Sequence, residues 1–211
     1  MSDLPEAGGA PLRGGGDEPP VPRSAATVIL LRRGGKHAAR GLEVLLVQRN
    51  PEARFMPGVW VFPGGAVDSD DGAGEAAHRA AAVRELAEEA GIEVPADELV
   101  AYSRWITPRV VPIRFDTRFY LALAPAHSPP QPDGSETVDA GWFAPQKALE
   151  RHHAGEMPLV FPTIKHLESL VGFANAAEAL EAARRREVKP VEPRVVGEGG
   201  ERRILLPDEL P

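Results

Sequence analysis

The chain of 211 residues contains no cysteine. This absence excludes disulfide scaffolds, thiolate metal sites and cysteine nucleophiles. The sequence also has no apolar run close to the roughly 20 residues that a membrane-spanning helix needs, and its N-terminus lacks the basic and then apolar pattern of a signal peptide. We therefore expect a soluble, cytoplasmic protein without a membrane partner.

Positive charge is also in short supply. Lysine and arginine total 24 against 31 aspartates and glutamates, which leaves a formal net charge of −7. Proteins that bind nucleic acid through its phosphates normally show a basic surface, so we expect no stable nucleic-acid binding. An acidic protein can still bind the phosphates of a small molecule through a metal ion.

Acidic side chains are concentrated in one short run, Arg84 to Ile92, which ends in Gly91-Ile92. On a helix of about 100° per residue, Glu85, Glu88 and Glu89 fall within roughly a quarter of the circumference. The residues expected to pack on the opposite face are apolar: Ala76, Ala80, Val83, Leu86, Ala87 and Ala90. Like charges at these spacings cost an isolated helix about 0.2–0.5 kcal/mol per pair, and a hard divalent cation would offset that repulsion.

The alternative is that these glutamates are only the solvated side of an amphipathic helix. The surrounding sequence favours the metal, because Gly91 is a typical helix C-cap and the helix follows Phe62-Pro63-Gly64-Gly65 after an apolar strand. Carboxylates suit Mg²⁺ or Mn²⁺, and a glycine turn can bring a backbone carbonyl, that of Gly64 or Gly65, close to the ion.

The run resembles the signature of the Nudix hydrolases, whose second half it matches from Arg84 to Ile92. The first half of the signature differs. Asp71, rather than a glutamate, follows Gly65 after five residues, and twelve residues instead of seven separate Asp71 from Arg84. An alternative alignment takes Glu75 as the first acid, but its spacings to Gly65 and Arg84 are both too long. We prefer Asp71.

This resemblance implies an α/β domain of the α+β kind, the Nudix fold, with a mixed sheet sandwiched between helices and extra C-terminal helices. It implies metal-dependent hydrolysis of a diphosphate in a small nucleotide, with Mg²⁺ or Mn²⁺ as cofactor, and it suggests that two copies pair as a homodimer. The residues to which it assigns roles are the metal ligands Glu85, Glu88, Glu89 and the Gly64 carbonyl, the catalytic residues Glu85, Glu89, Arg84 and Glu136, and the substrate-binding residues Arg49, Arg114 and Gly65.

Several of these roles have alternatives. Arg84 is expected to orient Glu85 or Glu88 rather than touch the substrate. Glu136, the candidate general base, is a loop glutamate and could be merely solvated. The same holds for Arg49, a candidate phosphate ligand at a strand end.

Two further arginines and the aromatic and histidine side chains also have alternatives. Arg114 and Arg118 alternate with Asp116, so an ion-pair ladder competes with phosphate binding. The aromatic residues Phe55, Trp60 and Trp105 could stack on a base or belong to the core. None of the six histidines has metal-ligand spacing, and we expect them to be solvated.

The substrate class follows only from finer resemblance. Asp68 and Asp71 after the glycine pair, together with segments between residues 24 and 170, are similar to the coenzyme A and acyl-CoA diphosphatases, whose products are 3′,5′-ADP and (acyl-)phosphopantetheine. One branch of the coenzyme A enzymes has a characteristic sequence directly before Phe62, and that sequence is absent here, where the chain reads Gly58-Val59-Trp60-Val61. The alternatives are ADP-ribose, a dinucleotide or a nucleoside triphosphate as substrate, or a non-catalytic nucleotide-binding module, which would be expected to lose some of the glutamates.

Composition predicts three regions. Residues 1–23 are rich in glycine, proline and acids and are expected to form a disordered lead. Residues 24–190 are expected to form the Nudix domain. Residues 191–211 are a tail that favours a hairpin around glycines 197, 199 and 200. The patterns predict strands at 24–33, 42–48, 59–62, 98–106, 110–123 and from 136 to 143, and helices at 75–90, 145–153, 163–171 and 175–186.

Overall fold

The computed structural model describes residues 18–33, 41–197 and 202–209. Residues 1–17 of the predicted lead and the glycines at 199 and 200 lie outside the described residues. The strands are β1 (Arg23–Arg33), β2 (Leu42–Arg49), β3 (Trp60–Val61), β4 (Gly64–Ala66), β5 (Val100–Ile106), β6 (Phe115–Leu123), β7 (Thr137–Phe143), β8 (Pro190–Val191), β9 (Arg194–Val196) and β10 (Arg203–Leu205). The helices are α1 (Gly74–Ala90), α2 (Pro145–His153), α3 (Phe161–Leu170) and α4 (Ala176–Arg184), with short 3₁₀ turns η2 (Ser69–Asp71) and η3 (Ala96–Glu98).

The main sheet is mixed, with strand order β3-β2-β1-β6-β5-β8, and β1 lies near its centre. β1 runs antiparallel to β2 and β4 but parallel to β6. Its residues from Val28 to Leu31 are fully buried. A strand covered on both faces is expected to be apolar without alternation, as the run Val-Ile-Leu-Leu is.

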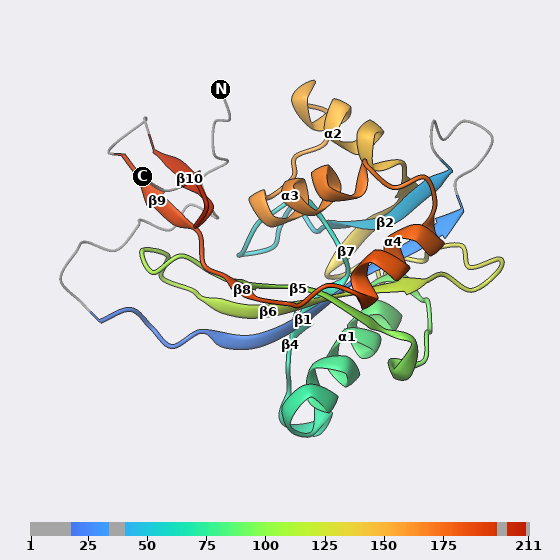
Figure 1. Ribbon diagram of the computed structural model, residues 1–211, viewed down its shortest axis with the longest axis horizontal. Helices are drawn as coiled ribbons and strands as arrows, with labels where there is room; N and C mark the ends of the chain where they lie inside the picture. The colour runs from blue at the N-terminus through green and yellow to red at the C-terminus, as the bar shows by residue number, and fades with distance from the viewer. Residues whose placement is uncertain (1–17, 34–40, 198–201, 210–211) are drawn as a thin grey trace.

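Helices cover both faces of this sheet: α1 lies on one face, and α2, α3 and α4 lie on the other (Figure 1). Alternate residues of β1 point to opposite faces, so Val28 and Leu30 pack toward α1, whereas Ile29 and Leu31 pack toward α3 and α4. The predicted fold class, a mixed sheet between helices with additional C-terminal helices, is confirmed. No helix in the described part of the chain is both long and apolar enough to cross a membrane.

The main differences from the predicted elements are at the strands. β6 begins at Phe115 rather than at residue 110, and Ile113, which falls within the predicted strand, lies outside β6 and is 46% exposed. Both faces of β6 are packed, since Phe119 and Tyr120 belong to opposite core clusters. The strands β4 and β8 were not predicted, because one consists mainly of glycine and the other is two residues long.

At the ends of the described chain, β1 already begins at Arg23, within the predicted lead. β9 and β10 pair antiparallel, with Val196 opposite Arg203, as expected for a hairpin in the tail. This small sheet stands apart from the main one at the end of the molecule where β8 leaves it (Figure 1).

Candidate active site

The glycine pair after Phe62 forms a strand rather than the predicted turn. β4 pairs antiparallel with β1, with Gly64 opposite Thr27 and Gly65 opposite Ala26. A Cβ atom added to Gly64 would lie 2.5 Å from both the carbonyl oxygen of Ala26 and Oγ1 of Thr27. Only glycine fits there, because real Cβ contacts are not that short, and this close pairing brings the β4 backbone alongside α1.

The β4 backbone also contacts the glutamates of α1. The N–H of Gly64 donates a hydrogen bond of 2.9 Å to Oε2 of Glu89. A Cβ added to Gly65 would lie 2.3 Å from Oε1 of Glu85, so the bare backbone of Gly65 makes room for that carboxyl group. We predicted a metal contact through the carbonyl of Gly64 or Gly65. The Gly64 N–H orients Glu89, and the metal contact of the carbonyl stays a prediction.

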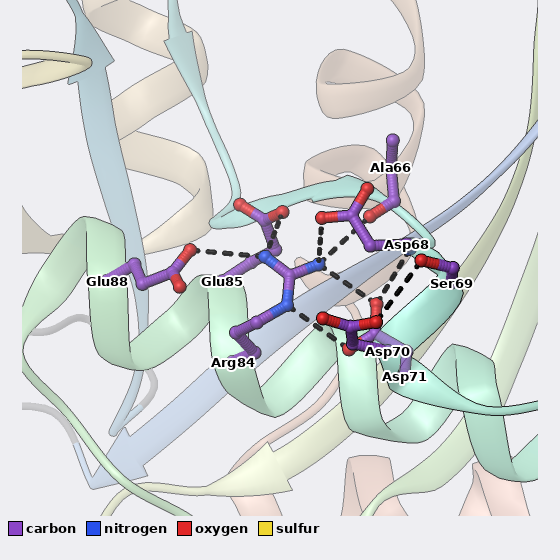
Figure 2. Close-up of polar contacts among 8 residues, drawn as sticks. All are labelled: Ala66, Asp68, Ser69, Asp70, Asp71, Arg84, Glu85 and Glu88. Carbon is purple, nitrogen blue, oxygen red and sulfur yellow. Dashed lines mark hydrogen bonds and ion pairs between the residues drawn. The ribbon is translucent and has the colours of Figure 1, made fainter.

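Arg84 is the centre of a network that joins α1 to η2 and β4 (Figure 2). Its Nε and Nη2 donate to the two carboxylate oxygens of Asp71, at 3.1 and 3.0 Å. Its Nη1 donates to Glu85 at 2.8 Å and to Glu88 at 3.1 Å, and Nη2 also reaches the carbonyl of Ala66. Arg84 therefore contacts both glutamates that it was expected to orient.

Asp71, and not Glu75, lies against Arg84. The hydrogen bond from Arg84 holds the pKa of the Asp71 carboxyl below its ordinary value despite partial desolvation. Glu75 instead contacts Arg118 and the hydroxyl of Tyr120. The structure thus supports the alignment that takes Asp71 as the first acid of the signature, with the longer gap accommodated between η2 and α1.

The three glutamates of α1 differ in environment, which the predicted helix faces did not anticipate. Glu89 is only 3% exposed and lies on the packed side of α1 with Leu86 and Ala90, whereas Glu88 is exposed. Burial raises the pKa of Glu89 to about 8, although the Gly64 N–H opposes the shift. Burial also raises the pKa of Glu85, against the effect of Arg84. The predicted face was wrong by about one residue because so many positions of α1 are alanine.

Five acidic side chains line one cavity of about 330 Å³: Glu85, Glu88, Glu89, Asp133 and Glu136. The first three come from α1, and the last two come from the loop before β7. Glu136, the candidate general base, is therefore brought to the α1 glutamates. Asp133 was not singled out from the sequence. The only signal for it was the turn sequence Asp133-Gly134-Ser135, which gives the aspartate a turn-forming place but no chemistry.

The residues around this cavity fit a hard divalent cation by their chemistry. All of them offer carboxyl oxygens, the donors preferred by Mg²⁺ and Mn²⁺. Glu89 is buried with the neutral Gly64 N–H bonded to its carboxylate, so a bound cation would offset the cost of burying its charge. Within the described residues, no three acidic or histidine side chains already converge as ligands on one point. Arg84 holds Glu85 and Glu88, so these carboxylates would have to turn to reach an ion.

The two predicted substrate arginines lie in different places. Arg49, at the end of β2, donates from Nε to the Phe55 carbonyl at 3.3 Å, and its charge lowers the pKa of Glu89. Arg49 is therefore near the acidic cavity. The Arg114 side chain is 6% exposed, and its donors go to three other groups, so the structure does not support a substrate contact. Those acceptors are the Thr107 carbonyl, the Pro20 carbonyl and Glu192.

The predicted ion-pair ladder has other members than expected. Asp116 pairs with Arg104 of β5 at 2.8 and 2.6 Å, and Arg118 pairs with Glu75 of α1. The pairing is across neighbouring strands because Arg104 lies opposite Arg118 in the register, with Asp116 two residues away on the same face.

Among the aromatic candidates, Trp60 is buried in the core, and the ring of Trp105 packs against Phe161 and His166. The expectation that all histidines are solvated is wrong for His166. It is fully buried in an aromatic cage, its two ring nitrogens contact Ser103 and the Pro162 carbonyl, and burial lowers its pKa to about 4.

Comparison with known proteins agrees with this architecture. The NUDIX domain model matches residues 21–164. The Caenorhabditis elegans protein named nudix hydrolase 7 is 30% identical over 183 residues, which cover 70% of this chain and 60% of that protein. Human acyl-coenzyme A diphosphatase NUDT19 is 24% identical, over 66% of this chain and 63% of its own. This chain thus spans about 60% of the length of both relatives.

A solved structure is similar as well. The crystal structure of a NUDIX hydrolase from Alicyclobacillus acidocaldarius is 30% identical, with a TM-score of 0.67, and the match covers 76% of this chain and 96% of that one. The region that matches the NUDIX domain model, residues 21–164, includes both β4 and the glutamates of α1. The chain belongs to the Nudix family.

Proposed function

We propose that this chain is a metal-dependent hydrolase that cleaves a diphosphate linkage in a nucleoside diphosphate derivative. The observation that carries the proposal is the single cavity lined by Glu85, Glu88, Glu89, Asp133 and Glu136. In it, the three glutamates of α1 would hold Mg²⁺ or Mn²⁺. The intact set of glutamates favours an enzyme over a nucleotide-binding module that has lost catalysis.

When bound, a divalent ion lowers the pKa of a bound water and neutralises charge on the phosphate oxygens. The chain's own groups supply position and proton transfer. Arg84 holds Glu85 and Glu88 on the outer side of the cavity, and the Gly64 N–H holds Glu89 on the inner side. Glu136 would accept the proton of the attacking water. Arg49, near the cavity, would donate to a phosphate oxygen.

For the substrate, we propose coenzyme A or acyl-CoA, cleaved to 3′,5′-ADP and (acyl-)phosphopantetheine. Two features support this choice. Asp68 and Asp71 follow the glycine pair as in the coenzyme A diphosphatases, and in the structure both lie within ion-pair distance of Arg84. The second feature is the similarity to the human acyl-coenzyme A diphosphatase, at 24% identity.

The test is cleavage by purified protein with Mg²⁺ or Mn²⁺ across coenzyme A, an acyl-CoA, ADP-ribose, NADH and nucleoside triphosphates, with the products separated by chromatography. Release of 3′,5′-ADP would support the coenzyme A assignment. Preference for another compound would keep the chemistry and change the substrate. Absence of turnover on all of them would contradict the hydrolase and leave nucleotide binding as the alternative.

Substitution of the α1 glutamates tests the site itself. We expect Glu89→Gln to abolish turnover and to keep the fold, because the amide oxygen can still accept from the Gly64 N–H while the charge is lost. Glu88→Gln should also abolish turnover and, since Glu88 is exposed, should not change stability. Turnover at the wild-type rate by either folded variant would rule out the metal assignment. Circular dichroism and the thermal midpoint check folding.

A further inference from the structure

One side chain organises the loop that carries Glu136. The carboxylate of Asp133 accepts hydrogen bonds from the Glu136 N–H at 3.1 Å and from the Thr137 N–H at 2.8 Å, and the Thr137 hydroxyl lies 2.9 Å from it. The carboxylate also accepts a hydrogen bond from the Ser135 hydroxyl. Although partial desolvation opposes it, these bonds hold the pKa of Asp133 below its ordinary value. The Asp133 carboxylate therefore contacts each of the residues from 135 to 137.

The same loop is anchored at both of its sides. Thr137 is fully buried, and its hydroxyl lies 2.8 Å from the carbonyl oxygen of Glu89, near the end of α1. From the other side, the Asn50 N–H donates to the Glu136 carbonyl, and the Asn50 amide nitrogen donates to the Ser135 carbonyl, both at 2.8 Å. Asn50 follows Arg49 directly, so the loop contacts two elements of the cavity.

These bonds occupy both backbone groups of Glu136, whose side chain lines the cavity. We infer that Asp133 is a positioning residue: through its bonds to the loop, it holds the Glu136 carboxyl at the cavity for proton transfer. This inference rests on the proposed function, in which Glu136 accepts the proton. Asp133 lines the same cavity, but its carboxylate oxygens already accept from the Glu136 and Thr137 N–H groups and the Ser135 hydroxyl, so it acts through Glu136 rather than as a metal ligand.

The loop is a tight turn in which two backbone N–H groups, those of Glu136 and Thr137, use the Asp133 carboxylate as their acceptor. Gly134 has a positive φ of 77°, and its N–H bonds to the Thr137 carbonyl, closing a turn over the aspartate. Without the Asp133 carboxylate, the N–H groups of Glu136 and Thr137 lose their acceptors. A displacement of about 1 Å at a catalytic group can cost about 100-fold in rate, so the looser loop should slow the reaction.

The experiment compares wild type, Asp133→Ala, Glu136→Gln and the double variant, with coenzyme A and Mg²⁺, or ADP-ribose if coenzyme A is not cleaved. We expect Asp133→Ala to lower kcat by about 10- to 100-fold with little change in KM. In the Glu136→Gln background, the same substitution should have no further effect, because the group that it positions is already gone. Asp139→Ala is the matched control and should behave as wild type, since in the described part of the chain the Asp139 carboxylate accepts a hydrogen bond only from the neighbouring Ala140 N–H.

The conservative variant separates positioning from charge. Asp133→Asn keeps the size of the side chain and one acceptor oxygen, so most of the turnover should be retained. A loss as large as in Asp133→Ala would overturn the inference and indicate that the charge itself is required, as in a metal ligand. An equal loss in the wild-type and Glu136→Gln backgrounds would overturn it as well.

Amide hydrogen exchange gives a readout that does not depend on turnover. The N–H groups of Glu136 and Thr137 should exchange faster in Asp133→Ala, and those of α1 should not change. Unchanged exchange at both loop positions would overturn the inference. If the wild-type protein cleaves none of the compounds in the substrate test above, the proposed function fails, and exchange alone decides whether Asp133 holds the loop.

Discussion

Gly64 and Gly65 are neighbours in β4, but each is glycine for a different physical reason. A side chain at Gly64 would collide with the backbone of β1, which cannot move without disrupting the sheet. A side chain at Gly65 would collide only with the carboxyl end of Glu85, which is flexible. The first glycine therefore serves the fold, and the second serves the position of a candidate metal ligand.

This contrast predicts different outcomes for two alanine substitutions. Gly65→Ala should fold normally and lose most of its turnover, because the new methyl group displaces the Glu85 carboxylate. Gly64→Ala should instead destabilise the protein by about 1–3 kcal/mol, as overpacking does. Urea unfolding and turnover of both variants measure the two effects. Equal stability of the two variants would show that the β1 contact is not as tight as described.

At the same scale, the sequence indicated which residues gather but not how they are held. The spacing of Glu85, Glu88 and Glu89 placed them on one helix, and Glu136 was assigned to the same site by resemblance. Burial of Glu89 and the role of Asp133 could not be predicted. Burial of Glu89 depends on contacts with residues far away in the chain, such as Gly64 and Thr137. The bonds of Asp133 are local, but they matter for the site only because the fold places its loop at the cavity.

At the scale of elements, local signals set the helix ends well. The N-cap of α4 is an example: Asn175 and Glu178 have the spacing of a capping box, and Oδ1 of Asn175 accepts from the Glu178 N–H at 3.0 Å. The return bond differs slightly, since Glu178 accepts from the N–H of Ala174 rather than from that of Asn175. α4 packs on the sheet through Leu180, so its start is coupled to the core.

We expect Asn175→Ala to lower the free energy of unfolding by about 1 kcal/mol, because the N–H of Glu178 loses its acceptor. Turnover should not change, since α4 covers the face of the sheet opposite α1. Denaturant titration gives the stability. Asn175→Ser, which can still cap, is the control and should stay close to wild type.

The elements that were missed are those without local signals. α2 and β2 were predicted with nearly correct bounds because each has a local signal. α2 has a proline at its start, and β2 contains an apolar run. β4 reads as a turn in the sequence because glycine favours turns, and only its register with β1 makes it a strand. The predicted strand began too early, at residue 110, because the alternating pattern of β6 continues into the preceding loop. Arg114 in that loop bonds to Pro20 and Glu192, and these contacts override the pattern.

At the scale of the whole molecule, the acidic cavity should make stability depend on pH and on metal. The folded pKa of Glu89 is about 8, above its ordinary value of 4.5, so between these values the folded state keeps a proton that the unfolded state has lost. The contribution of Glu89 to stability is therefore full below about pH 4.5 and is lost as the pH rises through 8. The difference in unfolding free energy between wild type and Glu89→Gln should decline over that window.

Divalent metal should act in the opposite direction. Protons compete with the ion for Glu89, so the stabilisation by Mg²⁺ should grow as the pH rises toward 8. At about 100 times its Kd, the ion should stabilise by about 2.7 kcal/mol, or raise the thermal midpoint by about 5–10 °C. Thermal scans with Mg²⁺ or with EDTA measure this shift. A midpoint that Mg²⁺ does not change at pH 8 in the wild type would contradict the site.

The parallel pairing of β1 with β6 has a consequence for how the protein is made. β1 leaves the ribosome before its partner Phe115–Leu123, which follows about 90 residues later. At about 5–20 residues per second, one edge of this apolar strand waits roughly 5 to 18 seconds for its neighbour. Until then, Val28 to Leu31 present an unpaired edge that is prone to aggregation, so nascent chains should need protection by chaperones most strongly before β6 emerges.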